Sequence, residues 1–253
     1  MKISFLGTGT SQGVPIIGCE CPVCKSIDPK DQRLRSSVLI ETQDTTLVID
    51  TGPDFRQQML RINQKNLDTV VFTHDHKDHT AGLDDVRAFN FIQKKAMQVY
   101  GEAYVLNTIK REFSYAFADY KYPGVPEIHL NEINEKPFYI NQTLITPIRG
   151  IHYKLPVLGF KIGNFAYITD MNFIDDSEIE KFKNIDTLVI NALRREKHIS
   201  HFCLDGALKI IKKSNVKQAY LTHISHKLGL YKEVSKELPK NVHLAYDGLI
   251  INI

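Results

Sequence analysis

Residues 73–79 contain three histidines and two aspartates, directly after the β-branched and aromatic run 69–72. Imidazole nitrogens and carboxylate oxygens are ligands that zinc and similar divalent ions accept. His74 and His76 lie two residues apart, so in an extended segment their side chains share a face. Metal-binding histidines on a helix would instead be four residues apart. We therefore expect a metal site at the end of a strand, and not a solvated loop that happens to contain histidines.

Three further polar residues follow apolar runs: His152, Asp170 and His223. Singly, each is more typical of a satisfied core or rim residue than of a ligand. Together with the ligands in residues 73–79, they are numerous enough to fill two adjacent metal positions.

Three of the four cysteines, Cys19, Cys21 and Cys24, lie within six residues, and Cys203 stands alone. The N-terminal residues are typical of a first strand and not of a secretory signal, which argues against a disulfide framework. Three neighbouring thiols indicate a metal clip, with a reduced, metal-free cluster as the alternative. Cys203 is interpreted as a small buried hydrophobe.

Short apolar runs that alternate with amphipathic stretches must position these residues. Apolar patterning predicts strands at 2–6, 37–41, 46–50, 69–73, 97–100, 143–148, 157–162, 165–169, 187–191, 218–222, 242–246 and 249–253. It predicts helices near 54–62, 80–95, 103–113, 175–183 and 204–213. Hairpins are expected at 39–49 and 159–167, so the sheets should be mixed and not purely parallel. We expect one domain over residues 1–253, with an irregular stretch at 114–142 that covers the opening of the site.

The composition is that of an ordinary globular protein. The 253 residues are 43% apolar and 24% charged, with a net charge of +3. This even balance argues against a dedicated nucleic-acid surface, and no apolar run approaches the ~20 residues that cross a bilayer. A cytoplasmic protein without a membrane partner is the expectation.

The order of the motifs resembles that of the metallo-β-lactamase fold hydrolases. The resemblance rests on the strand ending at residues 48–52, on the His-x-His-x-Asp-His motif at 74–79, and on the later His, Asp and His. It implies an α/β fold, a four-layer αββα sandwich of two mixed β-sheets flanked by helices. It also implies a first metal held by His74, His76 and His152, a second held by Asp78, His79 and His223, and Asp170 as the bridge. Asp50 would orient one of the ligands.

The cysteines narrow the resemblance further. With residues 6–15 and 50–56, they resemble the subgroup of phosphoribosyl cyclic phosphate phosphodiesterases (PhnP-like). That subgroup pairs a dinuclear centre with a structural zinc site, which implies zinc held by Cys19, Cys21, Cys24 and His226. The family also suggests a homodimer.

In phosphodiesterases of this fold a histidine faces the metals across the substrate phosphate. By residue order this is His201, with His198 at the edge, and a pKa near neutrality would suit the task. The expected reaction is hydrolysis of a small, in some cases cyclic, phosphodiester by hydroxide formed at two divalent ions (Zn, Mn or Fe), with His201 and Asp78 as catalytic residues. Arg33, Arg35 and Arg56 are candidates to meet a second anionic group. The alternatives are a tRNA 3′-processing endonuclease, although no tRNA-gripping insertion is found, and a non-catalytic metal-binding scaffold.

Overall fold

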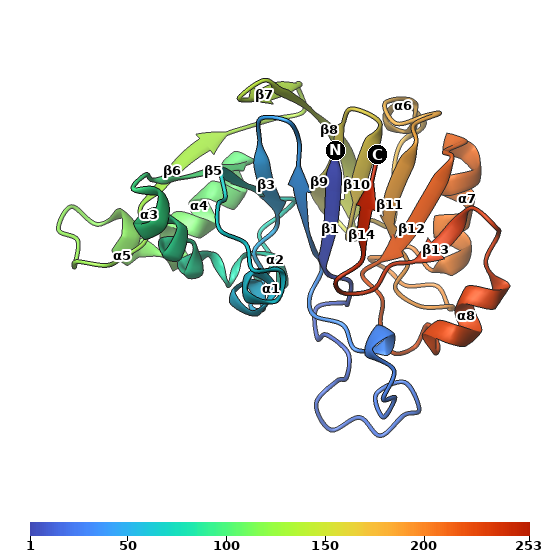
Figure 1. The fold of residues 1–253 in the computed structure, drawn as a ribbon. Coiled ribbons are helices and arrows are strands. Elements are labelled where there is room, and N and C mark those ends of the chain that lie inside the picture. The colour runs from blue at the N-terminus through green and yellow to red at the C-terminus, as the bar shows by residue number, and fades with distance from the viewer.

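Two seven-stranded β-sheets pack face to face, with helices on both outer faces (Figure 1). The structure is a computed structural model that describes all of residues 1–253. The strand order in the first sheet is β14-β1-β2-β3-β4-β5-β6, and in the second sheet β13-β12-β11-β10-β9-β8-β7. The expected four-layer αββα sandwich of two mixed sheets is confirmed.

The first sheet consists of β1 (Lys2–Gly7), β2 (Ser37–Glu41), β3 (Thr46–Ile49), β4 (Thr69–Val71), β5 (Met97–Gly101), β6 (Ile128–Glu132) and β14 (Ile250–Asn252). The second sheet consists of β7 (Phe138–Ile140), β8 (Thr143–His152), β9 (Leu155–Ile162), β10 (Phe165–Ile168), β11 (Thr187–Asn191), β12 (Gln218–Thr222) and β13 (Val242–Leu244). Both expected hairpins form, because β2 pairs antiparallel with β3 and β9 with β10.

The helices lie outside the sheets. Beside the first sheet are α1 (Phe55–Ile62), α2 (Lys77–Thr80), α3 (Arg87–Gln93), α4 (Ala103–Glu112) and α5 (Ser114–Phe117). Beside the second are α6 (Asp176–Glu180), α7 (Leu204–Ser214) and α8 (Tyr231–Glu237). Two 3-10 turns span Pro29–Asp31 and Leu83–Val86. No helix combines the length and the apolar character that a membrane span requires.

Alternation of side chains along the strands produces three apolar layers. On β2, Val38 and Ile40 enter the layer between the two sheets, and Leu39 enters the layer beneath α1, α3 and α4. On β10, Phe165 faces the layer between the sheets, and Ala166 faces the layer beneath α6, α7 and α8. Both faces of each sheet are thus buried, which explains why the central strands are apolar throughout.

The helix expected over 80–95 is wrong, because the chain there is broken into α2, a 3-10 turn and α3. The break is at Gly82, where an added Cβ would lie 2.1 Å from the backbone oxygen of Gly52. This close approach of two loops next to residues 73–79 requires glycine and ends α2 early.

The stretch 114–142 is not irregular, since it contains α5, β6 and β7. β6 and β7 are edge strands, and the polar composition of β6 hides the alternation that predicts a strand. The loop that contains Gly124 and Val125 lines a hollow with Arg87 and Phe91 of α3, at the outer end of the first sheet (Figure 1). The expectation that this loop covers the opening of the metal site is therefore wrong. α8 was also not predicted, because Val234 is its only buried residue.

Candidate metal centres

The topology of the sheets brings the polar residues to one edge of the sandwich. β3, β4 and β5 run parallel, so Asp50 and residues 73–79 follow carboxyl ends at the same edge. β10, β11 and β12 also run parallel, and β8 shares their direction because β9 is antiparallel to both β8 and β10. His152, Asp170 and His223 therefore lie together at the matching edge of the second sheet.

The first ligand group is His74, His76 and His152, whose ligand atoms lie within 4.8 Å of one another. His74 is fully buried, and its Nδ1 lies 2.9 Å from the Thr73 hydroxyl. The Nδ1 of His152 donates to the Ser200 carbonyl oxygen at 2.7 Å. These contacts leave the Nε2 atoms for the site, and that of His74 is buried without a partner. His76 is the exposed member.

The second ligand group is Asp78, His79, Asp170 and His223, again with ligand atoms within 4.8 Å of one another. The Nδ1 of His79 donates to Asp50 at 2.7 Å. Its Nε2 lies 3.2 Å from Asp78 and 3.4 Å from Asp170. The Nδ1 of His223 lies 2.9 Å from Asp170, and its Nε2 is buried without a partner.

The buried carboxylates of this second group favour a bound cation. Burial opposes the charge on His79, but the carboxylates of Asp78, Asp170 and Asp50 raise its pKa well above the usual value. A proton on His79 thus offsets the buried negative charge in the protein alone. A divalent ion among the same oxygen and nitrogen atoms would do so more completely. The residues present therefore fit a pair of divalent ions.

Three site residues adopt the left-handed backbone conformation: Asp50 (φ 65°), Asp170 (φ 55°) and His223 (φ 53°). Each such conformation costs on the order of 1–3 kcal/mol and persists only where its surroundings enforce it. Next to Asp170, the Asn191 side chain bonds both the N–H and the carbonyl oxygen of Met171 at 3.0 Å. The turn at Asp170 is thus fixed independently of any ion.

His201 lies against both ligand groups. Its ring centroid is 4.6 Å from that of His152 and stacks at 4.8 Å on that of His223. Its Nδ1 is buried without a partner and lies 3.9 Å from Asp170. Burial lowers the pKa of His201 to about 3, below the near-neutral value that would suit the expected role. His198 lies at the edge as expected, with its ring centroid 5.3 Å from that of His201.

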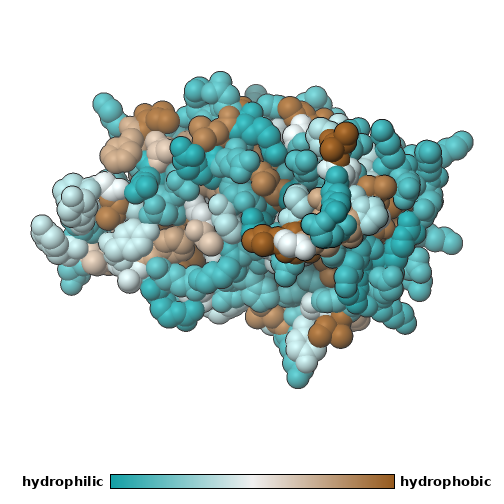
Figure 2. All heavy atoms as spheres, turned by 90° about the horizontal axis from the view of Figure 1, so that it is seen from below, coloured by the Kyte–Doolittle hydropathy of each residue, from teal (hydrophilic) through white to brown (hydrophobic).

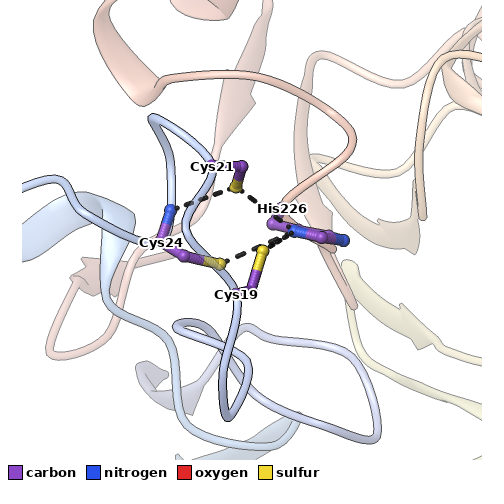
Figure 3. A group of neighbouring side chains, drawn as sticks. All are labelled: Cys19, Cys21, Cys24 and His226. Atoms are coloured by element: carbon purple, nitrogen blue, oxygen red, sulfur yellow. Dashed lines mark hydrogen bonds between the residues drawn. The ribbon is translucent and has the colours of Figure 1, made fainter.

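Cys19, Cys21 and Cys24, on the loop that projects at the bottom of Figure 1, form a separate cluster with His226 of the segment after β12 (Figure 3). The Nδ1 of His226 lies 3.2 Å from the Cys19 sulfur, 3.3 Å from that of Cys21 and 3.6 Å from that of Cys24. A hydrogen bond from the Cys24 N–H lowers the pKa of Cys21 to about 6, and burial raises that of Cys24 to about 11. Three sulfurs and one imidazole are a donor set for tetrahedral zinc. Cys203 lies apart, at the start of α7, and is only partly buried.

Two of the three arginines expected to meet an anionic group are engaged elsewhere. Arg33 is 5% exposed and donates to the Thr8 hydroxyl at 2.7 Å and to a backbone oxygen. Arg35 pairs with Asp54 at 3.0 Å. Both side chains are thus held by protein partners, and Arg56 is exposed and makes no ion pair. The expected contact of these arginines with an anionic group stays a prediction.

Thr73, Asn191 and the Ser200 carbonyl support the site, although no sequence motif predicts a role for them. Thr73 donates to Asp50 from both its N–H and its hydroxyl and also contacts His74. Asn191 is a polar residue at the end of the apolar strand β11. The same pattern predicted a role for Asp170, so it could also have pointed to Asn191. No pattern could mark a backbone carbonyl.

A family model described as "Beta-lactamase superfamily domain" matches residues 45–224. This chain belongs to the beta-lactamase superfamily. The matched range contains both ligand groups, whereas the three cysteines precede it and His226 follows it. The family resemblance inferred from the motifs is confirmed.

Similar proteins extend the comparison beyond that range. A crystal structure described as a new diphosphatase from the PhnP family matches with a TM-score of 0.93 and 36% identity, over 99% of this chain and 96% of that one. Zn²⁺-bound PqqB from Methylobacterium extorquens shares the fold, with a TM-score of 0.80 and 17% identity over the full length of both chains.

A curated relative from Porphyromonas gingivalis, named octanoyltransferase, is 42% identical over 252 residues. The match covers 98% of this chain and 51% of the relative, so this chain spans about half the length of that protein. The name describes the longer protein as a whole.

Proposed function

We propose that this protein is a dinuclear metal-dependent phosphodiesterase that acts on a small phosphorylated substrate. The observation that carries the proposal is the position of His201, whose buried, unpartnered Nδ1 faces two adjacent ligand groups. A phosphate between the histidine and the ligand groups would have polar partners on both sides. The likeness to a PhnP-family diphosphatase supports the same reaction class. In a disubstituted diphosphate, as in a phosphodiester, the attacked phosphorus is linked through oxygen to two groups.

Each ligand has a proposed role. His74, His76 and His152 would hold one divalent ion, Asp78, His79 and His223 the other, and Asp170 both. Bound there, the ions supply a water of lowered pKa and neutralise charge on the phosphate oxygens. Asp50 orients His79, and the Ser200 carbonyl orients His152.

His201 acts from the opposite side of the phosphate. Its neutral imidazole donates a hydrogen bond to a phosphate oxygen, and the negative charge of a bound phosphate favours the protonated ring. The protonated ring can then give its proton to the departing ester oxygen. The His223 ring stacked on it and the tilted His152 ring beside it fix its orientation.

The face seen in Figure 2 is largely hydrophilic, and its hydrophobic groups are scattered. This face carries the projecting cysteine loop, whose sulfurs lie next to His226, three residues after His223 of the second ligand group. A polar substrate suits such surroundings better than a long acyl chain.

The test is a substrate panel with the protein reconstituted in Zn²⁺ or Mn²⁺. We expect chelator-sensitive hydrolysis of bis(p-nitrophenyl) phosphate and of a disubstituted diphosphate, and little hydrolysis of a phosphate monoester. His201→Ala should lower kcat about 10²- to 10⁴-fold at unchanged metal content. Cleavage of pre-tRNA alone would establish the nuclease instead. Cleavage of an octanoyl thioester alone, or of nothing in the panel, would refute the proposal.

A further inference from the structure

The turn at the proposed metal ligand His223 is held by residues from the start of the chain. His223 is 1% exposed and adopts the left-handed conformation, which persists only where its surroundings enforce it. The next residue, Ile224, donates from its N–H to the Thr8 carbonyl oxygen at 2.9 Å, and its own carbonyl accepts from the Thr10 N–H at 3.1 Å. Both backbone polar groups of Ile224 are thus fixed by residues 8–10, which directly follow β1.

Residues 8–10 are also held from their other side. The Gly9 N–H donates to the Leu34 carbonyl oxygen at 2.8 Å, while Gly9 forms a parallel bridge with Ile224. An added Cβ on Gly9 would lie 2.9 Å from the backbone oxygen of Arg33, so this close approach requires glycine. Residues 8–10 therefore join the segment before β2 to the segment after β12.

Two buried charged groups meet at the Thr8 side chain. Thr8 is fully buried, and its hydroxyl accepts from the Arg33 guanidinium at 2.7 Å and donates to the Asp247 carboxylate at 2.8 Å. Arg33 also donates to the Ala245 carbonyl oxygen at 2.6 Å, and Asp247 accepts from the Leu34 N–H at 2.8 Å. The Thr8 hydroxyl is therefore the donor and the acceptor that connects the two charges.

Stability alone is a poor explanation for this network. Arg33 is 5% exposed and the Asp247 side chain 6% exposed, and the removal of charges from water costs free energy. Burial lowers the pKa of Arg33 to about 10, so the guanidinium stays charged at neutral pH, and burial raises the pKa of Asp247. Apolar side chains of similar volume often replace such buried charges without loss of stability. What the charges add is a defined orientation of the Thr8 hydroxyl, which must accept on one side and donate on the other.

We propose that Thr8, held by Arg33 and Asp247, is a positioning residue for His223, and through it for the ion of the second ligand group. The path has two steps. The two charges fix the Thr8 side chain, and the Thr8 carbonyl then fixes Ile224 directly after His223. The inference rests on the proposed function only through the assignment of His223 as a metal ligand.

The test is a titration of Co²⁺ into protein that carries zinc only at the cysteine cluster, followed by calorimetry and by visible absorption. The wild type should bind two Co²⁺ ions. Thr8→Val, which keeps the shape but loses the hydroxyl, should bind one of them about 10- to 100-fold more weakly and with an altered absorption spectrum. The affinity for the other ion should not change. Thr8→Ser keeps the hydroxyl and should retain the wild-type affinity and spectrum.

Thr45→Val is the matched control for a purely structural effect. Thr45 is 2% exposed, and its hydroxyl donates to the Ile140 carbonyl oxygen at 3.2 Å. It lies just before β3, at the opposite end of that strand from Asp50. Thr45→Val should lower Tm and leave both Co²⁺ affinities unchanged. If Thr8→Val likewise lowers Tm but binds both ions as the wild type does, Thr8 is only structural and the inference is overturned.

Asp247→Asn, a milder change, gives the same comparison if Thr8→Val does not fold. The amide keeps one accepting oxygen, so either the Thr8 hydroxyl or the Leu34 N–H loses its acceptor. One ion should again bind more weakly, and two unchanged affinities would overturn the inference.

Failure of the proposed function gives a different result. If the wild type binds both ions but hydrolyses no phosphodiester, the proposed reaction is refuted, and the binding comparison still decides the role of Thr8. A wild type that binds fewer than two Co²⁺ ions would overturn both.

Discussion

Asp50 satisfies three donors with two carboxylate oxygens, and this sets the geometry of the second ligand group. One oxygen accepts from the Thr73 N–H at 2.9 Å. The other accepts from the Thr73 hydroxyl at 2.8 Å and from His79 at 2.7 Å. The bond from His79 places the proton on Nδ1 and leaves Nε2 for a metal ion.

Asp50→Asn should therefore weaken metal binding without removing a ligand. The amide has one accepting oxygen, so either Thr73 or His79 loses its partner. We expect metal affinity to fall about 10- to 100-fold, with a matching loss of activity at limiting metal. Calorimetric metal titration measures it. The control is Asp75→Asn, since Asp75 accepts from Thr108 on α4. Unchanged affinity in Asp50→Asn would disprove the orienting role.

At this scale, residue type and spacing predicted which side chains the fold brings together, but not what holds them. All seven residues proposed as metal ligands, and the four residues of the cysteine cluster, lie in the groupings expected from the motifs. The supporting contacts from Asn191 and Ser200 join segments that are remote in the chain. Such contacts depend on the tertiary structure and leave no local pattern. The burial that lowers the pKa of His201 is hidden from the sequence for the same reason.

At the scale of elements, the cysteine cluster links the projecting N-terminal loop to the segment after β12. His226 follows His223 by three residues, so the same segment contributes to both the cysteine cluster and the second ligand group. Hydrogen bonds from the Ile16 N–H and the Cys24 N–H to cluster sulfurs, both at 3.4 Å, support the thiolate form.

Cys21→Ser should lower stability before it lowers activity, because structural zinc binding contributes directly to folding free energy. A loss of about 2 kcal/mol would lower Tm by about 4–8 °C in a protein of this size. Calorimetry together with elemental analysis would show one fewer zinc per chain. Cys203→Ser is the control and should retain the metal. An unchanged Tm after loss of one zinc would contradict a structural role.

Asp44 joins two hairpin tips, one from each sheet. Its carboxylate accepts from the Gln142 N–H at 2.6 Å and from the Thr143 hydroxyl at 2.8 Å, in the turn between β7 and β8. These bonds, led by that of Gln142, lower the pKa of Asp44 below its usual value. Its contribution to stability is therefore present above the unfolded pKa of about 3.8 and is lost as pH falls through the lowered value.

Asp44→Asn should thus have a lower Tm than the wild type at about pH 6, and the difference should shrink as pH falls toward about 3. Thermal unfolding of both proteins across this pH range measures the Tm difference. Acid affects the rest of the molecule equally in both proteins, so those effects cancel in the difference. Asp119→Asn, a change at an exposed position, should match the wild type throughout. A Tm difference for Asp44→Asn that does not vary with pH would count against the mechanism.

Strong apolar runs in the sequence predicted the central strands correctly. Peripheral elements with weak apolar patterns were not predicted. β6 has a polar edge-strand composition, and α8 has one buried residue, so neither carries a clear period. The helix expected over 80–95 failed because the break at Gly82 comes from contact with Gly52, which lies thirty residues away in the sequence. Tertiary contact decided these cases.

At the scale of the whole molecule, each half of the chain supplies part of both ligand groups. The segment after β4 of the first sheet carries His74, His76, Asp78 and His79. His152, Asp170 and His223 lie at the carboxyl ends of β8, β10 and β12 of the second sheet. The apolar layer between the sheets holds the two edges in register. The cysteine cluster also joins the two halves, because Cys19, Cys21 and Cys24 precede β2 and His226 follows β12. The expectation of one domain over residues 1–253 stays a prediction, as does the homodimer.

The most direct test of the account is a titration of divalent metal into metal-free protein, with bound ions and hydrolysis of bis(p-nitrophenyl) phosphate measured together. Activity should appear as two ions bind beyond the one zinc of the cysteine cluster. His76→Ala and Asp170→Ala should lower kcat by about a thousandfold, because each loses part of an ion site that supplies several kcal/mol. Full activity in either variant at matched metal content, or in the wild type with neither ion bound, would contradict a dinuclear phosphodiesterase.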